Sequence, residues 1–217
     1  MVKRTTLFVV AAATILSLTG TPSASAAVTR SRSAPPAAWQ ARTPGADLLE
    51  PGSYHHRLDR LVGTWKAVKY NYLLGEDGKP VVSRDITVRT RWMAKTGGRF
   101  LKEETEGTLA GHRYYRLGVL GFSSVDHRYE WTTFDSVTPT AMTYRGPALT
   151  EATDVLSIPG SFTDPGILGP KYLGKTIPMR TVIKIRSNDR HTFEIYFTPP
   201  GRPERLVDRV VYTRASA

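Results

Sequence analysis

The sequence predicts an all-β fold, an antiparallel up-and-down barrel of about ten strands that follows a short helical turn. From about residue 57 onward, runs of 6–10 residues rich in Val, Ile, Tyr and Trp are bounded by Gly, Pro, Asp and Asn. Almost all of the links are short, which favours antiparallel neighbours because parallel strands need a long crossover. An open sheet of ten strands would expose two edges, and closure removes them. A β-sandwich, which needs longer Greek-key links, is the alternative.

The first residues have the pattern of a secretory signal peptide, predicted over residues 1–26. Lys3 and Arg4 precede an apolar run at 7–18, and small residues at 24–26 offer a cleavage site. The run is short for a membrane span, so an uncleaved anchor is the less favoured alternative. A secreted, extracellular protein is therefore expected, with no transmembrane segment once the signal is removed. Residues 27–56, rich in Ala, Pro and Ser, are expected to form a flexible arm.

The barrel domain is predicted to occupy residues 57–217. A helical turn is expected near 54–62, because Leu58, Leu61 and Val62 have helical spacing. The long link at 164–176 is rich in Gly and Pro and could cover one mouth of the barrel. The strands are expected, in order, at 64–74, 86–92, 99–106, 114–122, 129–135, 141–145, 155–162, 179–186, 191–198 and 204–214.

A structural plug is predicted where the first strand begins, at Gly63-Thr64-Trp65. A large ring that closes one end of a barrel can be covered by a guanidinium from the last strand, here Arg214 or Arg209. Gly-x-Trp ahead of an all-strand chain of this length resembles the signature of the calycins, the lipocalin-like barrels. That resemblance implies a lipocalin-like barrel.

A second resemblance covers nearly the whole domain. It is carried by stretches at 61–65, 97–101, 104–107, 118–122, 129–136, 144–146, 180–183, 191–194 and 212–214. In their order and spacing these stretches resemble a bacterial family of lipocalin-like proteins, domain of unknown function 1579. The resemblance implies a β-barrel with an interior cavity, and it implies no particular reaction or ligand. The loop at 164–176 departs from the common pattern of the family.

Composition excludes several classes of protein. The chain has 217 residues, a formal net charge of +11 and no Cys, so a disulfide scaffold, a thiol nucleophile and a Cys-ligated metal are excluded. Lys and Arg are spread singly among apolar residues rather than gathered on one face. Specific nucleic-acid binding is therefore not expected. The basic surface could instead associate electrostatically with acidic cell-envelope polymers.

Five residues are candidates to line a ligand cavity. Trp92 lies on the apolar face of its strand, and Trp92 and Trp131 would stack on a ligand if their faces point inward. Asp135 shares the strand face of Trp131, and Arg180 could bind an anionic group at the mouth. Glu104 becomes a general acid if it faces the cavity, although a solvated strand face is the plainer interpretation. By strand parity, an inward Trp65 also brings Lys69 and Asn71 inward, whereas a bulge would turn Tyr70 and Tyr72 inward instead.

Two functions remain open. The first is a binding module for a small apolar or amphipathic ligand. The second is an isomerase- or hydrolase-like enzyme that uses Glu104, Asp135 or a histidine, although no Gly-x-Ser-x-Gly motif is present. No cofactor and no metal are predicted; a metal site across strands, or haem on His191 or His112, is the alternative. An exposed sheet face could also pair two copies into a homodimer.

Overall fold

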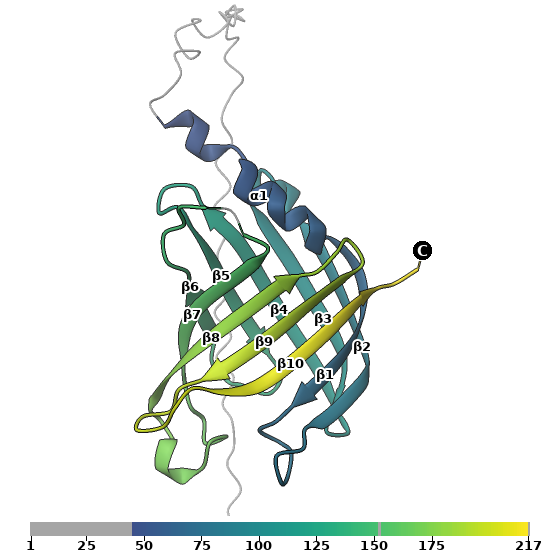
Figure 1. The fold of residues 1–217 in the computed structure, drawn as a ribbon, viewed down its shortest axis with the longest axis vertical. Coiled ribbons are helices and arrows are strands. Elements are labelled where there is room, and N and C mark those ends of the chain that lie inside the picture. The colour runs from purple at the N-terminus through teal and green to yellow at the C-terminus, as the bar shows by residue number, and fades with distance from the viewer. Residues whose placement is uncertain (1–44, 152, 217) are drawn as a thin grey trace, which may run out of the picture. The chain divides into compact units, whose positions relative to one another are not determined.

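The computed structural model describes residues 45–151 and 153–216. The predicted signal peptide and the first part of the predicted arm, through residue 44, lie outside the described residues. Ten antiparallel strands follow each other around a closed barrel in chain order (Figure 1). The first strand closes the ring against the last, with Trp65 opposite Arg214. The predicted antiparallel up-and-down barrel of about ten strands is therefore confirmed.

Each strand lies close to its expected place. One strand begins at Val81, five residues before the strict alternation that predicted it, and another begins at Thr176, inside the expected loop. The strands are β1 (Gly63–Asn71), β2 (Val81–Trp92), β3 (Phe100–Leu109), β4 (His112–Ser123), β5 (Arg128–Asp135), β6 (Met142–Arg145), β7 (Val155–Thr163), β8 (Thr176–Ile185), β9 (Arg190–Phe197) and β10 (Arg205–Arg214). The helical segments are η2 (Ala46–Leu49), α1 (Ser53–Arg57), η3 (Leu58–Leu61), η4 (Ala94–Thr96) and η5 (Pro170–Tyr172).

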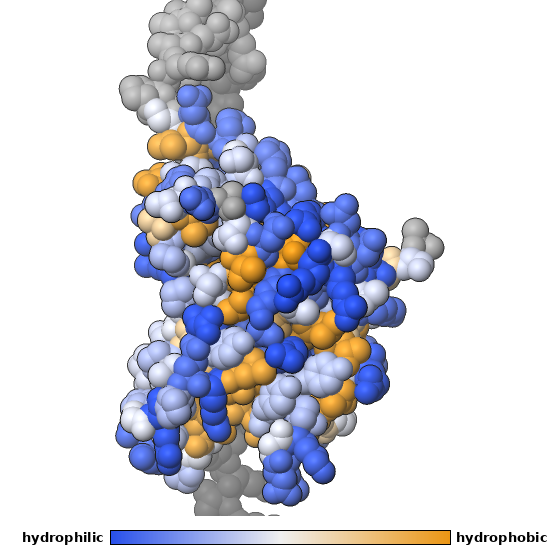
Figure 2. Space-filling model, in the orientation of Figure 1, coloured by the Kyte–Doolittle hydropathy of each residue, from blue (hydrophilic) through white to orange (hydrophobic). Residues whose placement is uncertain are grey.

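Strand alternation places apolar side chains inside the barrel and polar ones outside. On β9, His191, Phe193, Ile195 and Phe197 are buried, whereas Thr192 and Tyr196 are partly exposed. Every second side chain of a strand points to the same face, so these four share the interior. Figure 2 shows hydrophilic residues over much of the visible face, with hydrophobic residues between them. Burial of one large apolar side chain contributes roughly 1.5–3 kcal/mol, so the interior supplies most of the folding energy.

A helical cap formed by α1 and η3 covers one end of the barrel (Figure 1). Leu58 and Leu61 are buried, and the Tyr54 ring stacks on Phe122 with centroids 4.5 Å apart. Arg57 and Arg60 both donate to the Asp154 carboxylate, at 3.1 and 3.0 Å. The cap therefore includes residues 53–56, which precede the domain start expected at residue 57.

The opposite end carries the links β1–β2 and β7–β8 (Figure 1). In the β7–β8 link, Asp164 is fully buried and its carboxylate accepts hydrogen bonds from the backbone N–H groups of Gly166, Ile167 and Leu168. These bonds fix the link as a compact turn. Among the helices that the structure describes, none is long and apolar enough to cross a membrane.

Candidate functional site

The capped end of the barrel is closed by Trp65. Its side chain is fully buried, and Nε1 donates to the Leu61 carbonyl at 3.0 Å. The Arg214 guanidinium lies 4.2 Å from the Trp65 ring centroid and donates to the Val62 carbonyl at 2.8 Å. Gly63 has a φ of 138°, and a Cβ there would lie 2.3 Å from Arg214 Nη1. The structure thus brings together Gly63, Trp65 and Arg214, and only glycine leaves room for the guanidinium.

His191 completes the plug. Its ring lies edge-on to Trp65 with centroids 4.4 Å apart, and it stacks on Tyr212 at 4.1 Å. Burial, together with the nearby positive charge of Arg214, lowers the pKa of His191 to about 3. The imidazole is therefore neutral in the folded protein over the whole physiological range.

This neutral histidine makes stability fall with acid. The unfolded chain binds a proton on His191 below about pH 6.5, and the folded chain does not until near pH 3. The contribution is complete above pH 6.5 and is lost as the pH falls toward 3. Between pH 7 and pH 4 we expect the wild type to lose roughly 3 kcal/mol more than His191→Phe, measured by urea unfolding at each pH. Equal losses in the two proteins would show that His191 is not held neutral.

The open half of the barrel contains a cavity of about 170 Å³. Its walls are mainly apolar, its inner end is polar, and its rim comes from the links between strands. Ile167, from the β7–β8 link, reaches this rim, so the loop expected to cover the mouth does contribute to it. The cavity is lined by Lys69, Asn71, Leu73, Leu74, Leu109, Tyr114, Arg116, Thr133, Asp135, Val137, Thr138, Met142, Tyr144, Ile167, Ile195, Phe197, Val207 and Asp208.

Two polar residues of the rim hold the turns that follow their strands. Asn71 Oδ1 accepts from the backbone N–H groups of Leu73 and Leu74, at 3.1 and 2.9 Å. Asp135 Oδ1 accepts from those of Val137 and Thr138, at 2.9 and 2.6 Å. Asp135 therefore lines the cavity, as the sequence suggested, and also fixes the shape of its entrance.

Two buried ion pairs supply the polar inner end. Lys69 Nζ pairs with Asp208 Oδ2, and both side chains are more than nine-tenths buried. Arg116 Nη2 donates to Glu103 Oε1 at 2.5 Å, and its guanidinium lies 4.9 Å from the Phe193 ring centroid. Burial disfavours the charge of Arg116, but the Glu103 carboxylate outweighs it and holds the pKa of Arg116 above its usual value. Each cation thus has its own carboxylate.

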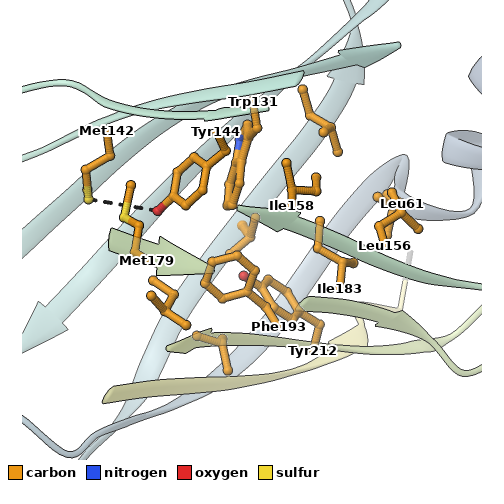
Figure 3. Packing of buried hydrophobic residues seen from close by; sticks show 14 of the residues in the cluster. Leu61, Trp131, Met142, Tyr144, Leu156, Ile158, Met179, Ile183, Phe193 and Tyr212 are labelled. Atoms are coloured by element: carbon orange, nitrogen blue, oxygen red, sulfur yellow. Dashed lines mark hydrogen bonds between the residues drawn. The ribbon is translucent and has the colours of Figure 1, made fainter. Parts of the chain in front are cut away.

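Trp131 lies deeper than the cavity wall. Its ring stacks on Tyr144 with centroids 5.1 Å apart, and meets Phe193 edge-on at 5.2 Å. Figure 3 shows Tyr144 between Trp131 and Met142, with its hydroxyl directed at the Met142 sulfur, 4.0 Å away. Burial raises the pKa of Tyr144 to about 12. Of these two stacked rings Tyr144 lines the cavity, and Trp131 supports it from behind.

Like Trp131, three other candidates from the sequence, Trp92, Arg180 and Glu104, do not line the cavity. Trp92 ends β2 at the capped end, where Nε1 donates to Asp59 at 2.7 Å. Arg180 lies on the outer face, bound bidentately to Glu204 at 2.9 and 2.6 Å. Arg180 points outward because its neighbours on β8, Met179 and Thr181, point inward.

Glu104 also lies on the outer face. Thr105, its neighbour on β3, is buried, and Glu104 pairs with Lys102 at 2.8 Å and Arg91 at 3.1 Å. The hydrogen bond from Lys102 lowers the pKa of Glu104, with the positive charge of Arg91 acting in the same direction. Glu104 therefore lies on a solvated strand face beside two cations, which was the plainer interpretation of the sequence, and its candidate role in the cavity is corrected: Glu103, paired with Arg116, is the inward carboxylate of this run.

Sequence reasoning missed Asp208 and Arg116 as site residues, and placed Lys69 inward without assigning it a role. Each is a charged residue on a strand face that is otherwise apolar: Asp208 with Val210 and Tyr212, and Arg116 with Leu120 and Phe122. A charge at an inward position of such a face is the signal that could have found them. Within residues 45–151 and 153–216, no three His, Asp or Glu side chains gather to hold a metal ion.

The sequence of the chain matches the model of a protein family. The model of the family described as "Protein of unknown function (DUF1579)" matches residues 50–214, which include α1, η3 and all ten strands. No curated protein matches the chain.

Three solved structures are similar to the chain at low identity. Rv2717c from M. tuberculosis is 15% identical with a TM-score of 0.49, covering 77% of this chain and 100% of that one. The S-type phycobiliprotein lyase CPES from Guillardia theta is 10% identical with a TM-score of 0.46, covering 79% and 97%. A redesigned β-barrel is 12% identical with a TM-score of 0.37, covering 74% and 96%. These likenesses are too distant to bear on the site.

Proposed function

The chain belongs to the DUF1579 family of proteins of unknown function, and on that premise we propose a function from the cavity itself: the barrel binds a small, mainly apolar ligand at its open end. The observation that carries the proposal is the volume of about 170 Å³ among the side chains of Leu109, Met142, Ile195 and Phe197. An apolar cavity of about 150 Å³ is enough to take up one benzene ring. Concave, mainly apolar sites with a few polar groups are the usual form of small-molecule sites.

The geometry around the cavity supports the same proposal. The plug at Trp65 and the cap close the far end, so a ligand enters between the β1–β2, β5–β6 and β7–β8 links. Closed strand pairing holds the walls, which keeps the ordering cost of binding low. We also propose that binding takes place outside the cytoplasm, on the basis of the signal-like pattern in residues 1–26.

Toluene tests this proposal, because it is a single apolar ring that fits the volume. Ligand-observed NMR should show saturable binding to the wild type. Ile195→Trp fills part of the cavity and should weaken binding by at least about tenfold, near 1.4 kcal/mol. Tyr196→Trp is the matched control, since Tyr196 is the next residue of β9 and points outward. Equal binding by both variants and the wild type would place toluene elsewhere and contradict the proposal.

A further inference from the structure

The polar inner end of the cavity has no net charge, a property that bears on the kind of ligand it accepts. Lys69 is paired with Asp208, and Arg116 with Glu103, so two cations face two carboxylates. Asp135, at the rim, adds a third carboxylate. An anionic ligand would therefore find each of the two cations already neutralised, and would lie near uncompensated negative charge.

The same inner end holds polar atoms that lack partners. Asp208 Oδ1, Arg116 Nε and Thr133 Oγ1 are buried and make no hydrogen bond within the described residues. All three side chains belong to residues that line the cavity and are more than nine-tenths buried. A carboxylate oxygen only accepts, a guanidinium N–H only donates, and a hydroxyl does both. Buried polar groups of this kind are costly unless a partner satisfies them.

We propose that the cavity selects a neutral molecule of about one ring that carries a hydroxyl group, with the ring in the apolar half and the hydroxyl at the inner end. This inference rests on the proposed function. The hydroxyl donates to Asp208 Oδ1 and, through its two lone pairs, accepts from Arg116 Nε and from Thr133 Oγ1, after side-chain shifts small enough to keep both ion pairs. A carboxylate can offer no hydrogen to Asp208, and an ammonium can accept none from Arg116. Selectivity against both charged analogues follows from these mismatches.

Four probes of nearly equal size show which ligand chemistry the cavity prefers. They are toluene, which is apolar, benzyl alcohol, which carries a neutral hydroxyl, benzoate, which is an anion, and benzylamine, which is a cation at neutral pH. At neutral pH, dissociation constants from ligand-observed NMR should be lowest for benzyl alcohol. We expect it to bind at least about tenfold more tightly than benzoate or benzylamine, and more tightly than toluene. If benzoate or benzylamine binds as well as the alcohol, or if toluene equals it, the inference is wrong while the proposed function stands. If none of the four binds, the proposed function fails as well.

A variant without the ion pair shows whether the inner end is responsible. Lys69→Met/Asp208→Leu removes both charges together and leaves no unpaired one. It should abolish the advantage of benzyl alcohol over toluene while toluene still binds. The matched control, Arg180→Met/Glu204→Leu, removes an ion pair on the outer face and should keep the advantage. An unchanged preference in the Lys69/Asp208 variant would contradict the inference. If that variant does not fold, Thr133→Val takes its place. It should lower the preference for benzyl alcohol over toluene, and an unchanged preference would contradict the inference.

Discussion

Trp65→Ala should lower the free energy of unfolding by about 3–5 kcal/mol, the range for removal of a buried large aromatic side chain. Trp65 is fully buried, and its ring contacts both the His191 ring and the Arg214 guanidinium. The substitution leaves a void at the closed end, removes the cation–π contact, and leaves the Leu61 carbonyl without the indole N–H. Urea denaturation of the wild type and the variant measures the difference.

Trp92→Ala is the control for this prediction. Trp92 is also a tryptophan near the cap, but it is only half-buried, and its N–H bonds to an exposed carboxylate. We expect a clearly smaller loss for it than for Trp65→Ala. A loss below about 1 kcal/mol for Trp65→Ala would mean that this ring does not close the barrel.

Lys69→Met should be as destabilising, by about 3–5 kcal/mol, because it leaves the Asp208 carboxylate buried without its cation. The methionine fills much of the volume of the lysine stem, so lost packing contributes little. The free energies of unfolding of the single variants Lys69→Met and Asp208→Leu and of the double variant form a cycle that isolates the interaction of the pair.

The double variant Lys69→Met/Asp208→Leu should recover most of the loss, since apolar replacement of a whole buried ion pair is often neutral or stabilising. Breaking the exposed pair by Arg180→Met should cost less than about 1 kcal/mol. If Lys69→Met costs no more than Arg180→Met, the Lys69–Asp208 pair is not held away from water as the structure has it.

Strand order and closure could be predicted because they depend on local signals. Alternation at Ile86, Val88 and Thr90 marks an inward face, and short links leave only antiparallel neighbours. The inward direction of Lys69 and Asn71 likewise followed from Trp65 by strand parity. The pairing of β1 with β2 shifts register between Ala67 and Lys69, but the side chains of β1 keep their alternation across this shift. Lys69 and Asn71 are therefore buried, and Tyr70 is not turned inward.

The candidate site could be predicted only in part, since it depends on which strands face each other across the barrel. Three charged residues follow each other at 102–104, so the sequence does not show which of them points inward. Leu101 and Thr105 are buried, and Glu103 lies between them on the same face of the strand. Trp92 has the parity of an inward residue, but it lies at the end of its strand, beyond the cavity and against the cap. The partnership of Lys69 with Asp208 joins residues 139 positions apart, which no local pattern reveals.

Intermolecular NOEs between bound benzyl alcohol and the methyl groups of the wild-type protein locate the ligand, and so they test whether it binds inside the barrel. We expect NOEs from the ring protons to the methyl groups of Met142, Ile195 and Val207, which line the cavity. We expect none to those of Leu58, which packs under the cap. NOEs confined to exposed methyl groups such as those of Val125 and Val155, with none to Met142, Ile195 and Val207, would contradict binding in the cavity.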